Sequence, residues 1–385
     1  MADCGQPIVM EGGGRRWKAC GGWPMHGSGG RQWRVAAIVV GDYRWRRLPV
    51  AAALTIVLLL LANSVSFSFS LELHFYRKTC PKAEIIVRAV LHRHIQQDPS
   101  IPARLLRLHF HDCFTTGCDG SILIDSTDDN IAEKEAPPNF SLRGFEVIDD
   151  IKTELEKVCP GIVSCADILA LATRDSVAFS GGFSYALRTG RRDGTVSRMA
   201  DFHIPSPSIT VSQALADFQS IKLDLVDLTT LLGYHGTTFA SLSGAHSIGF
   251  CHCGFFIDRL YNFKGTGLPD HEMDSNLLNR LRQKCPASTL QNISIDPNIF
   301  MNEGTSTPFK LDQSFFKNVL DAKAILQLDQ QLAFTNVTNK IVSRYVDRPK
   351  LFRKQFSQSM IKLGEVNVLT GKEGEIRHNC RRVNK

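Results

Sequence analysis

The stretch RLHFHDCFTTGCDGSILID, residues 107–125, concentrates more chemically distinctive side chains than any other part of the chain. Arg107 and His111 are four positions apart, so on a helix they lie on the same face, one turn from each other. A proton acceptor beside a fixed cation suits a reaction in which a proton moves while negative charge develops nearby. Because an isolated Arg-x-x-x-His pair usually has only a structural role, its surroundings have to decide.

Oxygen-bearing side chains follow this pair at once. Cys113 and Cys118 are five positions apart and can close a tight loop in an exported protein. Around that loop lie Asp112, Gly117, Asp119 and Ser121. Carboxylate and hydroxyl oxygens around a glycine turn are typical of calcium sites, although their order here differs from that of an EF-hand.

Zinc is the alternative metal, because His109 and His111 form an H-x-H pair and Cys251-His252-Cys253 offers soft ligands. On a helix, however, the two rings of H-x-H point to different faces, and disulfides would consume the thiols. A further histidine, His246, lies in FASLSGAHSIG at 239–249 and on its own could be an ordinary core residue. One histidine beside an arginine and another in an apolar pocket could together hold a cofactor between them.

The first 70 residues differ in composition from the rest. They hold eight Lys or Arg against three Asp or Glu, and all four Trp of the chain. The apolar run 48–62 follows three arginines and precedes small polar residues, which is typical of a secretory signal and short for a membrane span. We therefore expect residues 1–70 to be a leader that is removed. Residues 71–385 are nearly neutral, lack a basic stripe for nucleic acid and are expected to form the folded domain.

Helical periodicity dominates residues 71–385, and strand signals are weak and short. The spacing of apolar residues predicts helices at 85–94, 101–114, 144–158, 165–178, 211–221, 225–232, 276–284, 312–320, 340–346 and 350–363. The sequence therefore predicts a mostly α protein. Nine of the eleven cysteines lie in this domain, which in an exported chain indicates a disulfide framework with at least one thiol left over.

Short motifs along this domain occur in a family-specific order. They are FYRKTCP (75–81), RLHFHDCF (107–114), GCDGSILID (117–125), CPGIVSCADILALA (159–172), GRRDG (190–194), LSGAHSIG (242–249), LDQQL (328–332) and NCRRVN (379–384). With these motifs, residues 71–385 resemble the secretory plant haem peroxidases (class III) from end to end. The resemblance implies a two-lobed haem-peroxidase fold with one haem b between a distal and a proximal lobe. It also implies an oxidoreductase that reduces H₂O₂ and oxidises phenolic donors in one-electron steps.

The resemblance implies roles for single residues in the distal pocket. His111 would be the distal acid–base group and Arg107 the distal cation. Asn139 would accept the other ring hydrogen of His111 and so fix its tautomer, and Phe110 would form a wall of the pocket.

The resemblance also implies roles for residues on the proximal side of the haem and at the haem edge. His246 would be the axial iron ligand, and Asp329 would be its hydrogen-bond acceptor. Pro205 would lie near the exposed haem edge, where aromatic donors bind. Asp167 and Arg191 would form a buried structural ion pair.

Two calcium ions are implied as well. The distal site would use Asp112, Thr115, Gly117, Asp119, Ser121 and Glu133, with carbonyl oxygens from Thr115 and Gly117 and with Glu133 acting through water. The proximal site would draw its ligands from Ser247, Asn302, Thr305, Thr307 and Asp312. One carboxylate of the family pattern is lost there, at Gly304 or at Asn302 depending on the alignment. Because calcium affinity depends on the charge of the ligands, we expect the proximal site to be the weaker one.

The resemblance also implies the disulfides Cys80–Cys159, Cys113–Cys118, Cys165–Cys380 and Cys253–Cys285, with Cys251 left over. Asn292 and Asn336 lie in glycosylation sequons, whereas a buried role of Asn139 argues against modification of its own sequon. The implied protein is a secreted monomer of the cell wall or apoplast, without nucleic-acid partners or stable membrane association. The alternative is a secreted, disulfide-stapled binding or wall-structural protein that has lost catalysis, which a peroxide assay would reveal.

Overall fold

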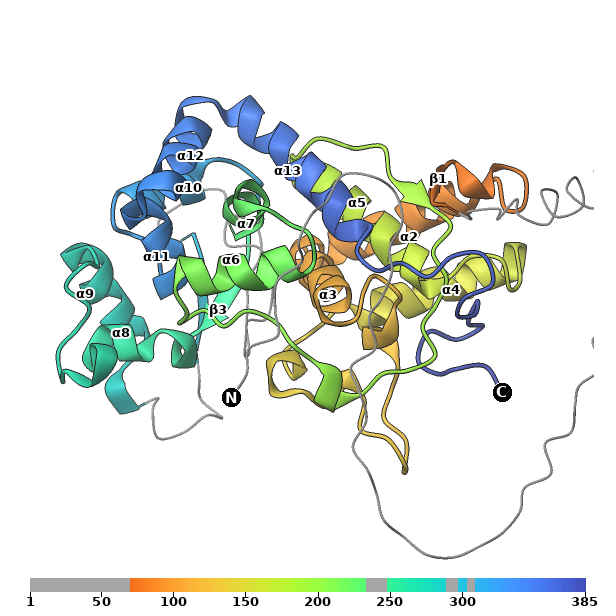
Figure 1. Cartoon of the computed structure of the whole chain (residues 1–385), viewed down its shortest axis with the longest axis horizontal. Coiled ribbons are helices and arrows are strands. Elements are labelled where there is room, and N and C mark those ends of the chain that lie inside the picture. The colour runs from red at the N-terminus through yellow and green to blue at the C-terminus, as the bar shows by residue number, and fades with distance from the viewer. Residues whose placement is uncertain (1–69, 233–247, 289–296, 303–308) are drawn as a thin grey trace, which may run out of the picture. The chain divides into compact units, whose positions relative to one another are not determined.

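The computed structural model describes residues 70–232, 248–288, 297–302 and 309–385 (Figure 1). All of them lie in the unit formed by residues 67–385. The expected leader, with its apolar run 48–62, lies outside the described residues. Within the described ranges, no helix combines the length and apolar character needed to cross a membrane.

The described residues are mostly helical, which confirms the predicted fold class. The α-helices are α2 (Ala83–Gln97), α3 (Ile101–Thr115), α4 (Phe145–Val158), α5 (Cys165–Phe179), α6 (Val211–Ser220), α7 (Leu225–Leu232), α8 (Ile257–Tyr261), α9 (Ser275–Lys284), α10 (Ser314–Leu320), α11 (Gln327–Phe334), α12 (Asn336–Asp347) and α13 (Pro349–Gly364). The strands form two short antiparallel pairs, β1 (Glu72–Leu73) with β2 (Arg188–Thr189) and β3 (Phe250–His252) with β4 (Asn298–Phe300).

Some helix boundaries differ from the predicted ones. Helices α8 and α11 were not predicted, and α12 begins at Asn336, four residues earlier than expected. Helix α10 begins at Ser314 and not at Asp312, because the Asp312 carboxylate accepts a hydrogen bond from the Ser314 backbone N–H at 2.8 Å. A side chain bound in this way holds the residues before the first turn in a non-helical conformation.

Helix α3 carries the site and is buried along almost its whole length. Pro102 stands in its first turn, where the missing N–H needs no partner. The helix packs on α5, whose first turn is capped by the Ser164 hydroxyl accepting from the Asp167 N–H at 3.1 Å. Helices α2 and α4 pack against each other, and both contact α5. Because other elements pack against α3 on several sides, side chains on its different faces lie in different buried environments.

A second group of helices, α7 and α10 to α13, is connected to α3 through α13. Helix α13 packs on both α7 and α3, and α12 packs on α10, α11 and α13 (Figure 1). Aromatic rings fill the space between them, with Phe316 in contact with Tyr345 and Phe352 at centroid distances of 5.1 and 4.8 Å. A separate small core lies under α8, α9 and the β3–β4 pair.

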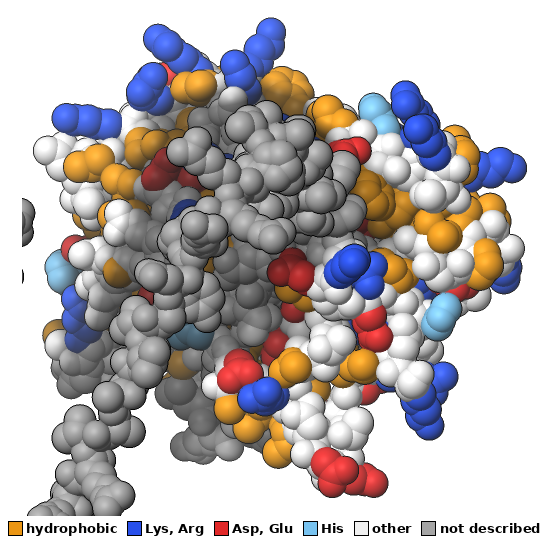
Figure 2. Space-filling model, turned by 45° about the vertical axis from the view of Figure 1, so that its right-hand side comes forward, with side chains coloured by type: hydrophobic (Ala, Val, Ile, Leu, Met, Phe, Trp, Pro, Cys, Tyr) orange, Lys and Arg blue, Asp and Glu red, His pale blue; other side chains and the backbone are white. Residues whose placement is uncertain are grey.

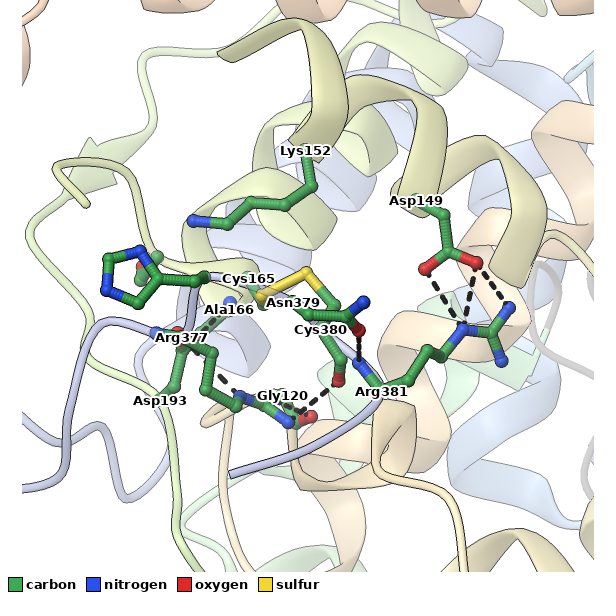
Figure 3. The surroundings of a disulfide bond; sticks show 12 residues. Gly120, Asp149, Lys152, Cys165, Ala166, Asp193, Arg377, Asn379, Cys380 and Arg381 are labelled. Carbon is green, nitrogen blue, oxygen red and sulfur yellow. Dashed lines mark hydrogen bonds and ion pairs between the residues drawn. A yellow bond between two sulfur atoms is a disulfide. The ribbon is translucent and has the colours of Figure 1, made fainter. Parts of the chain in front are cut away.

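Four disulfides tie these elements together, and they are the pairs implied by the resemblance: Cys80–Cys159, Cys113–Cys118, Cys165–Cys380 and Cys253–Cys285. Figure 3 shows the Cys165–Cys380 bond joining the start of α5 to the C-terminal segment. Cys251 is buried and belongs to none of the four. Because Cys253 is oxidised, the zinc alternative loses one of the two thiols on which it relied, Cys251 and Cys253.

A buried ion pair fixes the segment after β2. The Arg191 guanidinium donates to Asp167 Oδ1 at 2.8 Å, and both side chains are fully buried. The other carboxylate oxygen accepts from the Tyr76 hydroxyl at 2.7 Å and from the Gly190 N–H at 2.6 Å. This is the ion pair that the resemblance implied. On the surface, Figure 2 shows acidic and basic side chains interspersed on one face of the molecule.

Candidate active site

Arg107 and His111 project from consecutive turns of α3 and are both buried. One guanidinium nitrogen of Arg107, Nη2, donates to the backbone carbonyl of Pro138 at 2.7 Å. Burial, with a smaller contribution from the nearby Arg143 and against an opposing effect of Cys251, lowers the pKa of Arg107 to about 9. A buried cation held one turn from a histidine is the arrangement expected from the sequence.

Asn139 sets the protonation of the His111 ring. Its side-chain oxygen Oδ1 lies 2.6 Å from His111 Nδ1, and its amide nitrogen donates to the Glu133 carbonyl at 2.6 Å. The second bond fixes which end of the amide faces His111. Since an amide oxygen only accepts, Nδ1 of a neutral His111 carries the hydrogen and Nε2 is the basic nitrogen.

Aromatic side chains surround His111. The Phe110 ring is buried, with its centroid 6.3 Å from that of His111 and 4.9 Å from that of Phe114. Phe202 stacks on His111 from another segment, with a centroid distance of 5.8 Å and an interplanar angle of 30°. Phe202 could not be predicted from the sequence, because 91 positions separate it from His111 and no motif marks it.

Of the two residues expected on the proximal side of the haem, His246 and Asp329, the structure describes Asp329. It lies in the first turn of α11 with its side chain fully buried. Nearby, Arg259 of α8 donates to Asp270 at 2.8 Å and to the carbonyls of Ala324 and Ile325, just before α11. His246 lies outside the described residues, so its role as axial ligand stays a prediction.

A pocket of about 500 Å³ opens beside Pro205. It is lined in part by Ile204 and Ser206, the two neighbours of Pro205. Phe255, just before α8, and Asp258 of α8 also line it. Pro138, whose carbonyl binds Arg107, also lines it. The pocket therefore adjoins the distal residues and combines apolar with hydroxyl-bearing walls.

The loop after α3 gathers buried oxygen atoms. Asp112 accepts from the N–H groups of Gly120 at 3.0 Å and Ile122 at 3.4 Å. The Ser121 hydroxyl donates to Glu133 Oε2 at 3.3 Å, and the Ser121 N–H donates to Asp119 at 3.0 Å. Asp112, Asp119, Ser121 and Glu133 are thus brought together as expected.

The electrostatics of this loop suit a bound cation. Burial, and to a smaller extent the neighbouring Asp119, raises the pKa of Glu133 to about 8. Burial, Asp119 and Glu133 also raise the pKa of Asp112 well above its usual value. The buried Oε1 of Glu133 has no hydrogen-bond partner among the described residues. Three neighbouring carboxylates with an unsatisfied oxygen form a donor set that fits a hard divalent cation.

Gly117 and Thr115 lie at the end of α3 beside this loop. Gly117 has a φ of 137°, and a Cβ atom there would lie 2.6 Å from the Asn367 carbonyl oxygen, so a side chain is excluded. The Thr115 hydroxyl donates to the His111 carbonyl at 3.0 Å. Metal coordination by the two backbone carbonyls stays a prediction.

Around Asn302, the structure describes only part of the expected proximal site. Asn302 is buried, its amide nitrogen donates to the Ser314 hydroxyl, and its Oδ1 accepts from Asn318 at 2.6 Å. Ser314 also donates to Asp312, which links both expected ligands in one network. Ser314 and Asn318 were not predicted. The remaining candidates Ser247, Thr305 and Thr307 lie outside the described residues.

Comparison with known proteins gives one consistent result. A family model described as peroxidase matches residues 87–348. The chain is 45% identical over 314 residues to Peroxidase 57 of Arabidopsis thaliana, covering 82% of this chain and 93% of that protein. It is 44% identical over 344 residues to Peroxidase 28 of the same plant, covering 88% of this chain and 100% of that protein. The chain therefore belongs to the secretory plant haem peroxidases (class III), enzymes that act on H₂O₂.

Proposed function

We propose that Arg107, His111 and Asn139 form the peroxide-cleaving site of this peroxidase, with haem b held by His246 and phenolic donors oxidised beside Pro205. The observation that carries the proposal is the 2.6 Å contact between His111 Nδ1 and Asn139 Oδ1, one helical turn from a buried arginine. Haem, when bound, would supply the redox centre for cleavage of the O–O bond and would accept the electrons that the phenolic donor gives up.

The donor set fits this cofactor. On the distal side, a neutral histidine with its basic nitrogen fixed at Nε2 is paired with a buried guanidinium. On the proximal side, the buried carboxylate of Asp329 suits an acceptor for the ring N–H of His246, which would make that imidazole a stronger ligand.

The chain's own residues would then move one proton. Nε2 of His111 accepts a proton from H₂O₂ and delivers it to the oxygen that departs as water. The Arg107 guanidinium stabilises the negative charge that develops on that oxygen. Asn139 keeps Nδ1 protonated and so keeps the basic nitrogen directed toward the peroxide. A positioned acid–base group of this kind contributes about 10²–10⁴-fold to the rate.

Small phenolic donors suit the pocket beside Pro205. Its volume of about 500 Å³ is large enough for one aromatic ring with substituents. The ring of Phe255 and the side chain of Ile204 offer apolar contacts, and the Ser206 hydroxyl offers a hydrogen bond to a phenol. The residues so placed would position the donor without taking part in peroxide cleavage.

The proposal includes two calcium ions and export from the cell. The buried oxygens around Asp112, Asp119 and Glu133 support a tight distal site. The amide of Asn302, where the family can supply a carboxylate, supports a weaker proximal site. The expected secretory signal at 48–62 and the four disulfides support export to the cell wall or apoplast, where we propose that the mature protein is a monomer.

The test is the rate of reaction with H₂O₂, followed by stopped-flow absorption of the haem. His111→Leu should slow this reaction at least about 100-fold while haem stays bound. His109→Leu is the matched control, because His109 is a buried histidine on the other side of the same helix. Equal rates in wild type and His111→Leu would remove His111 from the mechanism.

A further inference from the structure

The C-terminal segment after α13 returns to the loop proposed to bind the distal cation. We call residues 117–125 the cation loop and residues 366–385 the C-terminal tail. The Cys118 N–H donates to the Val366 carbonyl at 3.0 Å, and the Asp125 N–H donates to the Arg381 carbonyl at 2.8 Å. The tail therefore binds the backbone of the cation loop at both ends of the loop.

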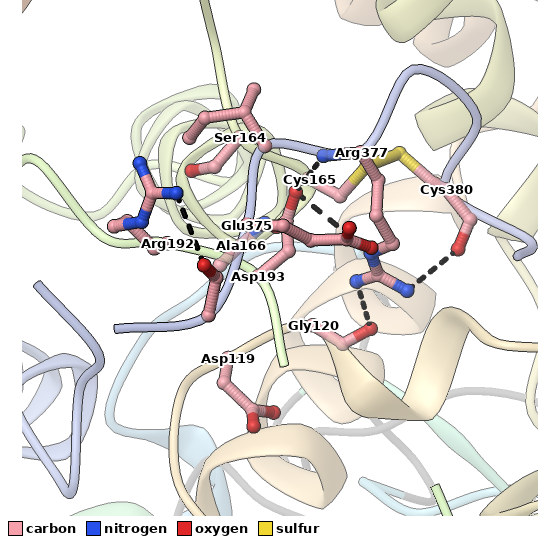
Figure 4. Close-up of polar contacts among 12 residues, drawn as sticks. Asp119, Gly120, Ser164, Cys165, Ala166, Arg192, Asp193, Glu375, Arg377 and Cys380 are labelled. Carbon is pink, nitrogen blue, oxygen red and sulfur yellow. Dashed lines mark hydrogen bonds and ion pairs between the residues drawn. A yellow bond between two sulfur atoms is a disulfide. The ribbon is translucent and has the colours of Figure 1, made fainter. Parts of the chain in front are cut away.

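Arg377 makes a third contact, at the centre of the loop. Its guanidinium is fully buried and donates from Nη2 to the Gly120 carbonyl at 2.6 Å and from Nη1 to the Cys380 carbonyl at 2.9 Å. Figure 4 shows this side chain reaching from the tail to Gly120, between Asp119 and the Cys165–Cys380 disulfide. Gly120 stands directly between the ligand candidates Asp119 and Ser121, so Arg377 fixes the backbone that carries both.

Asp193 holds Arg377 in this position. One of its oxygens accepts from the Arg377 backbone N–H at 2.8 Å and lies 3.8 Å from the guanidinium Nε, and the other accepts from the Ala166 N–H at 2.9 Å. Asp193 also pairs with Glu375 through two backbone hydrogen bonds of 2.8 and 2.9 Å. The positive charge of Arg377 is thus buried and is balanced by the carboxylate of Asp193.

Gly194 bounds the loop from the other side. Its N–H donates to the Asp119 carbonyl at 2.8 Å, and a Cβ atom at Gly194 would lie only 2.2 Å from the Asp119 carboxylate oxygen Oδ2. The Asp119 carboxylate therefore has its observed orientation only because residue 194 lacks a side chain. Arg377 fixes the backbone after Asp119, and Gly194 fixes the carboxylate itself.

We propose that the C-terminal tail is part of the distal cation site, so that cation binding and docking of the tail stabilise each other, with Arg377 and Gly194 as positioning residues. The proposal rests on the distal calcium site proposed above. Residues that hold metal ligands in place typically account for 10–100-fold in metal affinity. Because coupling between two binding events is reciprocal, the cation must in turn hold the tail in place.

Two substitutions perturb the two sides of the loop independently. Arg377→Lys keeps the charge opposite Asp193, but one ammonium group cannot reproduce the fork that binds two carbonyls. Gly194→Ala changes no charge and displaces only the Asp119 carboxylate. Arg259→Lys is the matched control, since Arg259 is also a buried arginine that binds an aspartate and two carbonyls, in a different part of the fold.

The experiment measures hydrogen exchange of the chelated holoprotein, resolved by peptide, while calcium is added back. In wild type, calcium should slow exchange in the cation loop and, over the same concentration range, in tail residues 366–379. In Arg377→Lys and Gly194→Ala, both effects should need about 10–100-fold more calcium. Arg259→Lys should leave the midpoint for the loop and tail unchanged.

Three outcomes would overturn the inference, and they differ in what else they refute. If calcium protects the loop but not the tail in wild type, the coupling is wrong and the distal site stands. If the variants keep the wild-type midpoint, Arg377 and Gly194 do not position the ligands. If calcium protects neither segment in wild type, the proposed distal site itself fails.

Discussion

The buried His109 should make the free energy of unfolding fall as the pH falls, by an amount that can be worked out from its pKa. The residue lies on α3 between the two distal side chains in sequence, but its ring is buried against the Cys113–Cys118 disulfide, with ring nitrogens 3.6 and 3.7 Å from Cys113 Sγ. Burial, with a smaller contribution from the nearby guanidinium of Arg191, lowers the pKa of His109 from 6.5 to about 3. Folded His109 is therefore neutral at every pH where the enzyme would work.

The magnitude follows from the difference between the folded and unfolded pKa values. Below pH 6.5 the unfolded chain binds a proton at His109, whereas the folded protein does not until about pH 3, so the free energy of unfolding falls as pH falls. At pH 5, which is about 1.5 units below the pKa of His109 in the unfolded chain, proton binding stabilises the unfolded state, and each unit is worth 1.36 kcal/mol. His109 should thus remove about 2 kcal/mol of stability between pH 7 and pH 5.

The assay is denaturant unfolding followed by far-ultraviolet circular dichroism at pH 7 and pH 5, with disulfides intact and calcium saturating. In His109→Leu, the loss of unfolding free energy between the two pH values should be smaller than in wild type by about 2 kcal/mol. Comparing each protein with itself cancels the effect of the substitution on packing. His271→Leu, at an exposed position, controls for the loss of one histidine. An identical pH dependence in wild type and His109→Leu would refute the reasoning.

The other predictions concern the ion pair, the proximal site and processing. Asp167→Asn leaves the buried Arg191 without its counter-ion and should cost about 3–5 kcal/mol of unfolding free energy, whereas Asp167→Asn with Arg191→Met should cost less; equal losses in denaturation experiments would contradict this. Calcium titration of the chelated protein should show one tight and one weak site, with Asn302→Asp tightening the weak one roughly tenfold; two equally tight sites in wild type would be inconsistent with a lost carboxylate. The secreted protein should begin within residues 65–71, as amino-terminal sequencing would show, and recovery of residues 1–47 outside the cell would disprove cleavage.

Helices with strong apolar periodicity could be predicted closely from the sequence. The start of α7 was predicted without error, and the boundaries of α3 and α5 to within one residue. Helix α8 has only five residues, too few to establish a period of 3.6. Helix α11 begins after Leu326, which offers no side-chain cap, so its start has no signal in the sequence.

Site residues that share one helix or loop could also be anticipated. Arg107, His111 and Asp112 are close in the chain, so helical geometry alone relates them. Phe202 reaches His111, and Arg377 reaches the cation loop, from distant segments through tertiary packing, which no local pattern encodes. The disulfide pairs depended on the family resemblance, because cysteine counts leave many pairings open.

The central claim is that His111 moves the proton during peroxide cleavage at a haem held by this fold. The most direct measurement is the absorption spectrum of purified wild-type and His111→Leu holoprotein, recorded before and after mixing with H₂O₂. Both proteins should show the same kind of Soret band at rest, with about one haem per chain. The wild-type spectrum should change within the mixing experiment, and that of His111→Leu at least about 100-fold more slowly. A resting wild-type protein without a Soret band, or a His111→Leu spectrum that changes as fast as wild type, would contradict the account.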